Sequence, residues 1–171
     1  MKLAFVLASL ALASNAALAA SPGHEMSGSM PMDHANHQNP VAGAALSSTL
    51  SVSDCWIRSL PAPAPSAGYF VVHNSGNTSA KLKSASSAAY GSVMLHQTTH
   101  DNGMSKMSMT HEIAIPANGK LEFKPGSYHA MLEKASKPVV VGTSVAMTFM
   151  FDSGEMAQAM CEVKPANTLA Q

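Results

Sequence analysis

From residue 47 onward the chain consists of short runs in which apolar and polar side chains alternate, and each run ends at a turn. Two clear runs are AGYFVVHN at residues 67–74 and SVAMTFMF at residues 144–151. Alternation with a period of two is typical of β-strands, and no window shows the longer period of an amphipathic helix. We therefore expect an all-β domain over residues 47–165, a sandwich or barrel of about eight or nine short strands, followed by a tail at 166–171.

The strongest turn signal is DNG at residues 101–103, which is typical of a β-hairpin. We expect one long strand, residues 104–115, to follow this turn. Because every second residue of a strand faces the same side, Met107, Met109 and His111 would then share a face.

The first 20 residues differ in character from the rest. They begin with Lys2, continue as an apolar run and end in small residues, which is the layout of a secretory signal peptide with cleavage after Ala19 or Ala20. The run is interrupted by polar residues, whereas a membrane anchor needs about 20 continuous apolar residues. We therefore expect a soluble protein that is exported to the periplasm and has no stable membrane insertion after cleavage.

Residues 21–46 are rich in Gly, Pro, Ser and Asn and have few large apolar groups, so we expect them to be disordered. This tail contains a group of side chains that bind metals, namely His24, Met26, Met30, Met32, His34 and His37. Such a tract favours metal capture, with thioethers suited to Cu(I) and imidazoles to Cu(II). The alternative is a flexible linker whose histidines are incidental.

Composition narrows the classes of function. Ten Lys and Arg balance ten Asp and Glu, and only 12% of the residues are charged. We therefore expect no nucleic-acid partner and no polybasic membrane patch. The chain also lacks a nucleophile with a positioned base and a paired-carboxylate arrangement, so we do not expect an enzyme.

Four residues carry the strongest chemical signal. His96 is followed after ten residues by Met107, and Met107 after twenty-one residues by His129, with Met131 two positions further on. Two imidazoles and two thioethers are the ligands that a soft metal ion of low charge prefers, above all Cu(I). The pattern therefore predicts a copper site formed by these four side chains.

Each of the four also has a more ordinary role that it could play alone. Methionine is most often a packing residue, and a histidine in a strand is often half-buried. Alternation supports the metal site, because His129 and Met131 share a face, as do Met94 and His96. Only the joint pattern of four favours metal binding over packing.

We do not expect the remaining methionines of the β-domain to be ligands and assign them to the core, the surface or the rim of the site. They are Met94, Met104, Met109, Met147, Met150, Met156 and Met160. His100 and His111 lie beside the hairpin and are weaker candidates for an auxiliary site, because no spacing argument selects them. His73 follows an apolar run, which favours a structural role.

The spacing of the four residues, with LHQTTHDNGMSKM and PGSYHAML around them, closely resembles the PCu(A)C family of periplasmic copper chaperones. The family signature is His, ten residues, Met, twenty-one residues and His-x-Met, and the resemblance covers roughly residues 47–164. It implies a cupredoxin-like β-barrel that binds Cu(I) at an exposed site. It also implies assembly of the copper centre of cytochrome c oxidase, with an oxidase subunit or another copper assembly factor as acceptor.

The two cysteines, Cys55 and Cys161, are compatible with this interpretation. Neither has the close Cys-x-His spacing of a blue-copper site, and they form no C-x-x-C pair. In an exported chain two cysteines are expected to form one disulfide, which here would join the first and last strands. The family signature does not include them.

Two other functions remain open on the sequence. The protein could be a copper buffer or resistance protein that uses the tail as its main site. It could instead be an exported β-sandwich binding module without metal.

Overall fold

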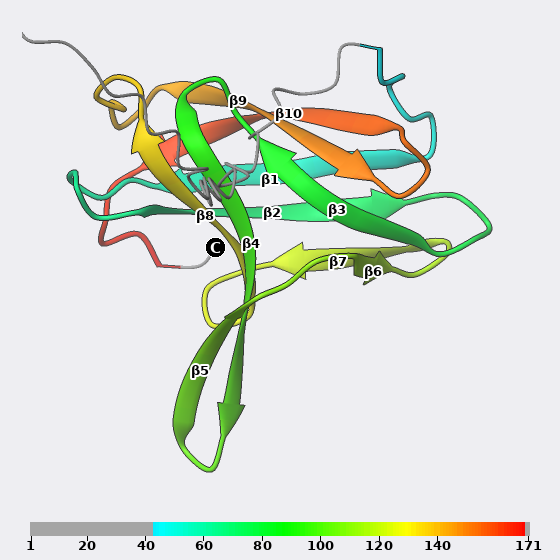
Figure 1. Ribbon diagram of the computed structural model, residues 1–171, viewed down its shortest axis with the longest axis horizontal. Coiled ribbons are helices and arrows are strands. Elements are labelled where there is room, and N and C mark those ends of the chain that lie inside the picture. Colours follow the sequence, from blue (N-terminus) through cyan, green and yellow to red (C-terminus); the bar gives the residue numbers. More distant parts are fainter. Residues whose placement is uncertain (1–42, 170–171) are drawn as a thin grey trace, which may run out of the picture. The chain divides into compact units, whose positions relative to one another are not determined.

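The computed structural model describes residues 43–169 (Figure 1). The predicted signal peptide at residues 1–20 and the six predicted metal-binding residues of the tail lie outside the described residues. At the start of the described part, the N–H of Met156 donates to the carbonyl of Ala45 at 2.9 Å, and Leu46 forms a β-bridge with Met156. The last residues of the predicted tail are therefore paired with the domain, which begins slightly before residue 47.

The described part of the chain contains ten β-strands and no α-helix, where the sequence predicted eight or nine strands. The strands are β1 (Leu50–Arg58), β2 (Ser66–Asn74), β3 (Ala80–Ser86), β4 (Tyr90–Asp101), β5 (Met104–Met109), β6 (Ile113–Ile115), β7 (Gly119–Phe123), β8 (Tyr128–Ala135), β9 (Ser144–Phe151) and β10 (Met156–Lys164). Within residues 43–169, no helix has the length and apolar character needed to cross a membrane.

The main departure from the expected strands lies in residues 104–115. β5 ends at Met109 and β6 begins only at Ile113, because Glu112 has a φ of 55°, which interrupts the extended backbone. The prediction of one continuous strand is therefore wrong. Strand alternation therefore no longer places His111 on the same face as Met107. His111 lies exposed between the two strands.

The strands form one sheet in the order β5-β4-β8-β2-β1-β10-β9-β3-β6, and β7 pairs with β2. The pairing of β1 with β10 is parallel, and the other pairings are antiparallel. The sheet curls so that β3 contacts β4, which encloses a single core. The expected cupredoxin-like β-barrel is confirmed.

The core is built on a small set of aromatic side chains. The ring of Phe70 on β2 stacks on Phe123 of β7, with centroids 4.2 Å apart, and lies 4.6 Å from the ring of Phe149 on β9. All three are almost completely buried. Burying such a side chain contributes roughly 1.5–3 kcal/mol, so these contacts between distant strands stabilise the curled sheet.

Cys55 on β1 and Cys161 on β10 form a disulfide, in agreement with the expectation of one bridge. The two residues precede Trp56 and Glu162, which are opposite each other in the parallel pair, and their Cα atoms are 4.4 Å apart. Cys161 is completely buried. The bridge therefore joins neighbouring strands that come from the two ends of the domain.

One edge of β2 is shared by β8 and β7, and this arrangement positions the candidate site. β8 pairs with Ser66–Gly68, whereas β7 pairs with Phe70–Asn74. The connection between β7 and β8, residues 124–127, leaves this edge and reaches β4, where the N–H of Thr98 donates to the carbonyl of Ser127 at 3.1 Å. Beyond this contact, the β4–β5 hairpin projects from the rest of the domain (Figure 1).

Candidate metal site

The projecting hairpin turns at Asn102 and Gly103, as the DNG motif predicted. Their φ angles are 48° and 78°, so both lie in the left-handed region that a tight two-residue hairpin turn requires. The turn sets the register of the hairpin, in which His96 is opposite Met109 and Thr98 is opposite Met107. It thereby determines which methionines of β5 lie on the same face as His96.

On the other side of β4, the pairing with β8 aligns the remaining predicted residues. His96 is opposite His129, and Met94 is opposite Met131. Opposite residues of an antiparallel pair project from the same face, with Cβ atoms about 4.5–5.5 Å apart. The imidazole rings of His96 and His129 meet edge to face, with centroids 5.8 Å apart.

Two donor atoms approach each other directly. The Nε2 atom of His129 lies 3.3 Å from the Sδ atom of Met107, although the two residues come from β8 and β5. The His129 side chain is only 7% exposed, whereas Met107 is 53% exposed. The histidine is therefore buried in the barrel, and it contacts a methionine that is open to solvent.

The tautomer of His129 follows from its second nitrogen. Nδ1 lies 3.0 Å from the carbonyl oxygen of Ser127, and because a carbonyl oxygen only accepts, Nδ1 must carry the proton. In the neutral ring, Nε2 then presents a lone pair towards the sulfur of Met107, which also presents lone pairs. A nitrogen and a sulfur bound to one tetrahedral metal at about 2.0 and 2.3 Å would be about 3.5 Å apart, close to the observed separation.

His96 is also held in the form that binds metals. Its Nδ1 atom is buried and has no hydrogen-bond partner in the described part of the chain. Burial lowers the pKa of His96 below 6.5, and the neighbouring His129 lowers this pKa further, while the charge of Glu133 acts in the opposite direction. The ring is therefore neutral at pH 7, with a nitrogen available for a ligand.

Met131 completes the predicted set. It is half-buried on β8, two residues from His129, and therefore on the same face of that strand. The three strands β4, β5 and β8 thus bring His96, Met107, His129 and Met131 to one face. We call this face the His/Met face.

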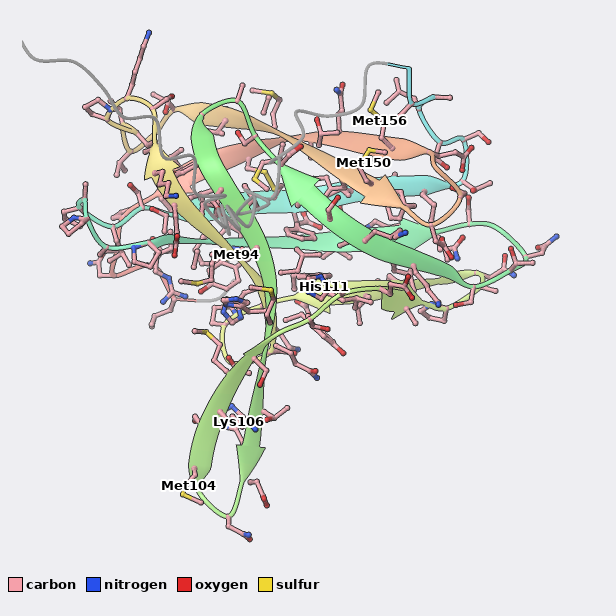
Figure 2. All side chains as sticks on the ribbon, in the orientation of Figure 1. Met94, Met104, Lys106, His111, Met150 and Met156 are labelled. Carbon is pink, nitrogen blue, oxygen red and sulfur yellow. A yellow bond between two sulfur atoms is a disulfide. The ribbon has the colours of Figure 1, made fainter. Side chains whose placement is uncertain are left out.

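Two further methionines, which the sequence interpretation did not count as ligands, also lie on the His/Met face. Met94 is opposite Met131, and Met109 is opposite His96. Figure 2 shows Met94 on β4 near the base of the hairpin. The period-two alternation had already placed both on the faces of predicted ligands, but the pairing of the strands was needed to join those faces into one.

Among residues 43–169, the other histidines are engaged in hydrogen-bond contacts or are exposed. His100 contacts the carbonyl of Gly126 through Nε2 at 3.2 Å and the hydroxyl of Ser105 through Nδ1 at 2.9 Å. The Nε2 atom of His73 lies 2.8 Å from the hydroxyl of Ser53. The contact of His73 is of the structural kind favoured for it, and both ring nitrogens of His100, a weaker candidate for an auxiliary site, already have partners.

Comparison with known proteins agrees with this architecture. Residues 50–163 match the family described as "Putative lipoprotein LpqE-like". A relative from Rickettsia prowazekii, "Uncharacterized protein RP573", is 37% identical over 103 residues, which make up 60% of this chain and 56% of the relative. The chain thus spans little more than half the length of that relative.

Solved structures share the fold. The "apo PmoF2 PCuAC domain" superposes with a TM-score of 0.60 at 22% identity, covering 74% of this chain and 98% of that domain. The solution structure of CuI-DR1885 from Deinococcus radiodurans superposes with a TM-score of 0.56 at 28% identity, covering 76% of this chain and 87% of that protein.

The curled ten-stranded sheet and its His/Met face define a cupredoxin-like domain of the PCu(A)C type. The chain belongs to the LpqE-like family and shares the fold of the solved PCuAC domain.

Proposed function

We propose that this protein is an exported copper carrier that binds one Cu(I) ion through His96, Met107, His129 and Met131. We further propose that it passes the ion to a copper-accepting protein and so contributes to the copper centre of cytochrome c oxidase. The shared fold with the PCuAC domain of PmoF2, which has also been solved in a copper-bound form, supports the general role. The Cu(I) form of the Deinococcus radiodurans protein supports the choice of metal.

The observation that carries this proposal is the 3.3 Å approach of His129 Nε2 to Met107 Sδ. In the neutral ring with its proton on Nδ1, no hydrogen lies between these two atoms, so two lone pairs face each other. A positive ion between them would turn this repulsion into attraction. The carbonyl of Ser127, which orients the ring, acts as the outer partner that metal-binding histidines usually have.

The donor types select the ion. Thioethers are soft and neutral, and neutral imidazoles add no charge, so the set suits Cu(I) and offers little to Mg²⁺ or Ca²⁺, which prefer oxygen ligands. A thioether also needs no proton when it leaves the metal. An acceptor can therefore replace the thioethers one at a time, and the exposed Met107 on the projecting hairpin is accessible to it.

Three features support action outside the cytoplasm. The sequence predicts a signal peptide at residues 1–20, the family is described as lipoproteins, and Cys55 and Cys161 are joined in a disulfide. Disulfides persist mainly in oxidising compartments such as the periplasm. We propose the periplasm as the place where the protein acquires and delivers copper.

The decisive experiment is an anaerobic Cu(I) titration of the exported chain against a competing chelator. In the variant with Met107→Leu and Met131→Leu, we expect the Cu(I) affinity of the tight site to fall at least about tenfold. Removing a group that only hydrogen-bonds to a metal ligand already costs about 10–100-fold in metal affinity, so removing two ligands should cost no less. Leucine keeps the volume of both side chains, so the fold should persist.

Two matched variants make the titration specific. Met160→Leu changes an exposed methionine on β10 and should leave the affinity unchanged. A variant in which the six tail residues, His24, Met26, Met30, Met32, His34 and His37, are all replaced by Ala should keep the tight equivalent. If copper binding instead follows the tail, the protein is a copper buffer; if no variant binds copper, it is a metal-free β-module.

A further inference from the structure

Met109 is an exposed methionine next to the candidate copper site that the four-residue pattern does not include. It lies on β5 directly opposite His96, and 54% of its surface is exposed. Four donors are already present on the His/Met face without it. Its thioether is therefore available to an ion at the site without being needed to hold it.

β5 is unusual for a strand at the end of a sheet. In the described part of the chain it pairs only with β4, so its other edge is open. Such edges normally carry charged residues that prevent unwanted pairing. β5 instead has the sequence MSKMSM, in which Met104, Met107 and Met109 are all more than half exposed and Lys106 is the single charged residue.

The two faces of β5 are not equivalent. Met107 and Met109 lie on the His/Met face, because they are opposite Thr98 and His96. Met104 is opposite Asp101 and lies on the other face, near the end of the hairpin (Figure 2). Met107 and Met109 thus form a pair of thioethers between the buried His129 and the open edge of the sheet.

We propose that Met109 is an exchange ligand, through which Cu(I) enters and leaves the site along the open edge of β5. This inference rests on the proposed function. In the exchange step a Cu–S bond to Met109 forms while the Cu–S bond to Met131 breaks. The copper remains Cu(I), and no proton or electron is transferred.

The kinetic consequence distinguishes an exchange ligand from a permanent one. A group on the exchange path lowers the barrier in both directions and leaves the equilibrium affinity unchanged. Removing it slows loading and release by the same factor. Removing a permanent ligand instead weakens binding and makes release faster, so the direction of the change in release rate separates the two roles.

The test measures anaerobic transfer of Cu(I) between the protein and an excess of a chromogenic Cu(I) chelator by stopped flow. The full exported chain with the six tail residues replaced by Ala serves as the parent. In Met109→Leu we expect loading and release to slow about tenfold each, equivalent to about 1.4 kcal/mol in the barrier, with little change in affinity.

Two leucine variants provide controls. Met104→Leu is on the same strand but the other face, and Met94→Leu is on the His/Met face but half-buried and away from the open edge. Both should transfer copper at the parent rate. If Met109→Leu releases copper at an unchanged or faster rate, or if either control slows equally, the exchange role of Met109 is overturned and the proposed function is not. If the parent binds no Cu(I), the proposed function is overturned as well.

Discussion

His96 and His129 are neighbours on the His/Met face, but different surroundings keep each ring in the form that binds metals. His129 is oriented by the carbonyl of Ser127, which receives both the Nδ1 proton of His129 and the backbone N–H of Thr98. His96 has a buried nitrogen without a partner in the described residues. One ring is thus oriented by a hydrogen bond and the other is kept neutral mainly by burial.

The lowered pKa of His96 predicts how the metal-free protein responds to pH. Between the pKa of the folded state and the unfolded value of 6.5, the unfolded chain binds more protons than the folded one. The free energy of unfolding should therefore decrease as the pH falls from 6.5 through the folded pKa of His96. In His96→Gln this component of the pH dependence should disappear.

Denaturant unfolding of the metal-free protein at a series of pH values, together with an NMR titration of the His96 ring, checks this prediction. The prediction fails if the ring titrates at or above 6.5. It also fails if wild type and His96→Gln lose stability in parallel over the same pH range.

At the level of elements, the β4–β5 hairpin controls the register of the site. Its turn places Met107 and Met109, rather than Met104 or Lys106, on the face of His96. β8 provides the other two predicted ligands from a strand that is fixed in the barrel between β4 and β2. The site thus combines one rigid strand with one projecting hairpin.

We expect Gly103→Val to disturb the hairpin and weaken Cu(I) binding. Gly103 has a φ of 78°, and a side chain in the left-handed region costs about 1–2 kcal/mol, more for a β-branched residue. The body of the barrel should remain folded, because a Cβ at Gly103 would have no neighbouring atom within 4 Å. The chelator titration measures the loss of affinity.

Gly154→Val is a matched control for this change. Gly154 lies between β9 and β10, has a φ of 83° and is equally open. Its replacement should lower stability by a similar amount and leave Cu(I) affinity unchanged. Equal copper affinities in the two variants would mean that the register of the β4–β5 hairpin does not determine binding.

At the scale of the whole molecule, the disulfide joins Cys55 and Cys161, which are 106 positions apart in the sequence. It reinforces the parallel pairing of β1 and β10, the first and last strands of the domain. In the chain-entropy account, a cross-link over such a long loop stabilises the fold mainly by restricting the unfolded chain.

Replacing both cysteines by Ala should lower the free energy of unfolding by about 2–5 kcal/mol. Because β1 and β10 do not contribute predicted ligands, the Cu(I) affinity of the folded variant should stay the same. Denaturant unfolding with and without reductant measures the first effect, and reductant should not affect the double variant. A stability equal to wild type, or a loss of copper affinity, would contradict this prediction.

Much of this arrangement could be predicted from the sequence, because strand alternation and turn chemistry are local. The period of two placed most strands, the Asn-Gly turn predicted the hairpin, and the spacing of His96, Met107, His129 and Met131 indicated one site on several strands. The split after Met109 was missed because the left-handed φ of Glu112 is not a preference of that residue type.

Only the tertiary structure decided which strands are neighbours. Pairing between distant strands depends on how the whole sheet buries its core, and no local pattern places β8 next to β4 or the Ser127 carbonyl against His129. That pairing merges the separate faces of three strands and places Met94 and Met109 on the same face as the four predicted ligands. The sequence by itself determined the donor types and their faces; long-range pairing of the strands brought those faces together.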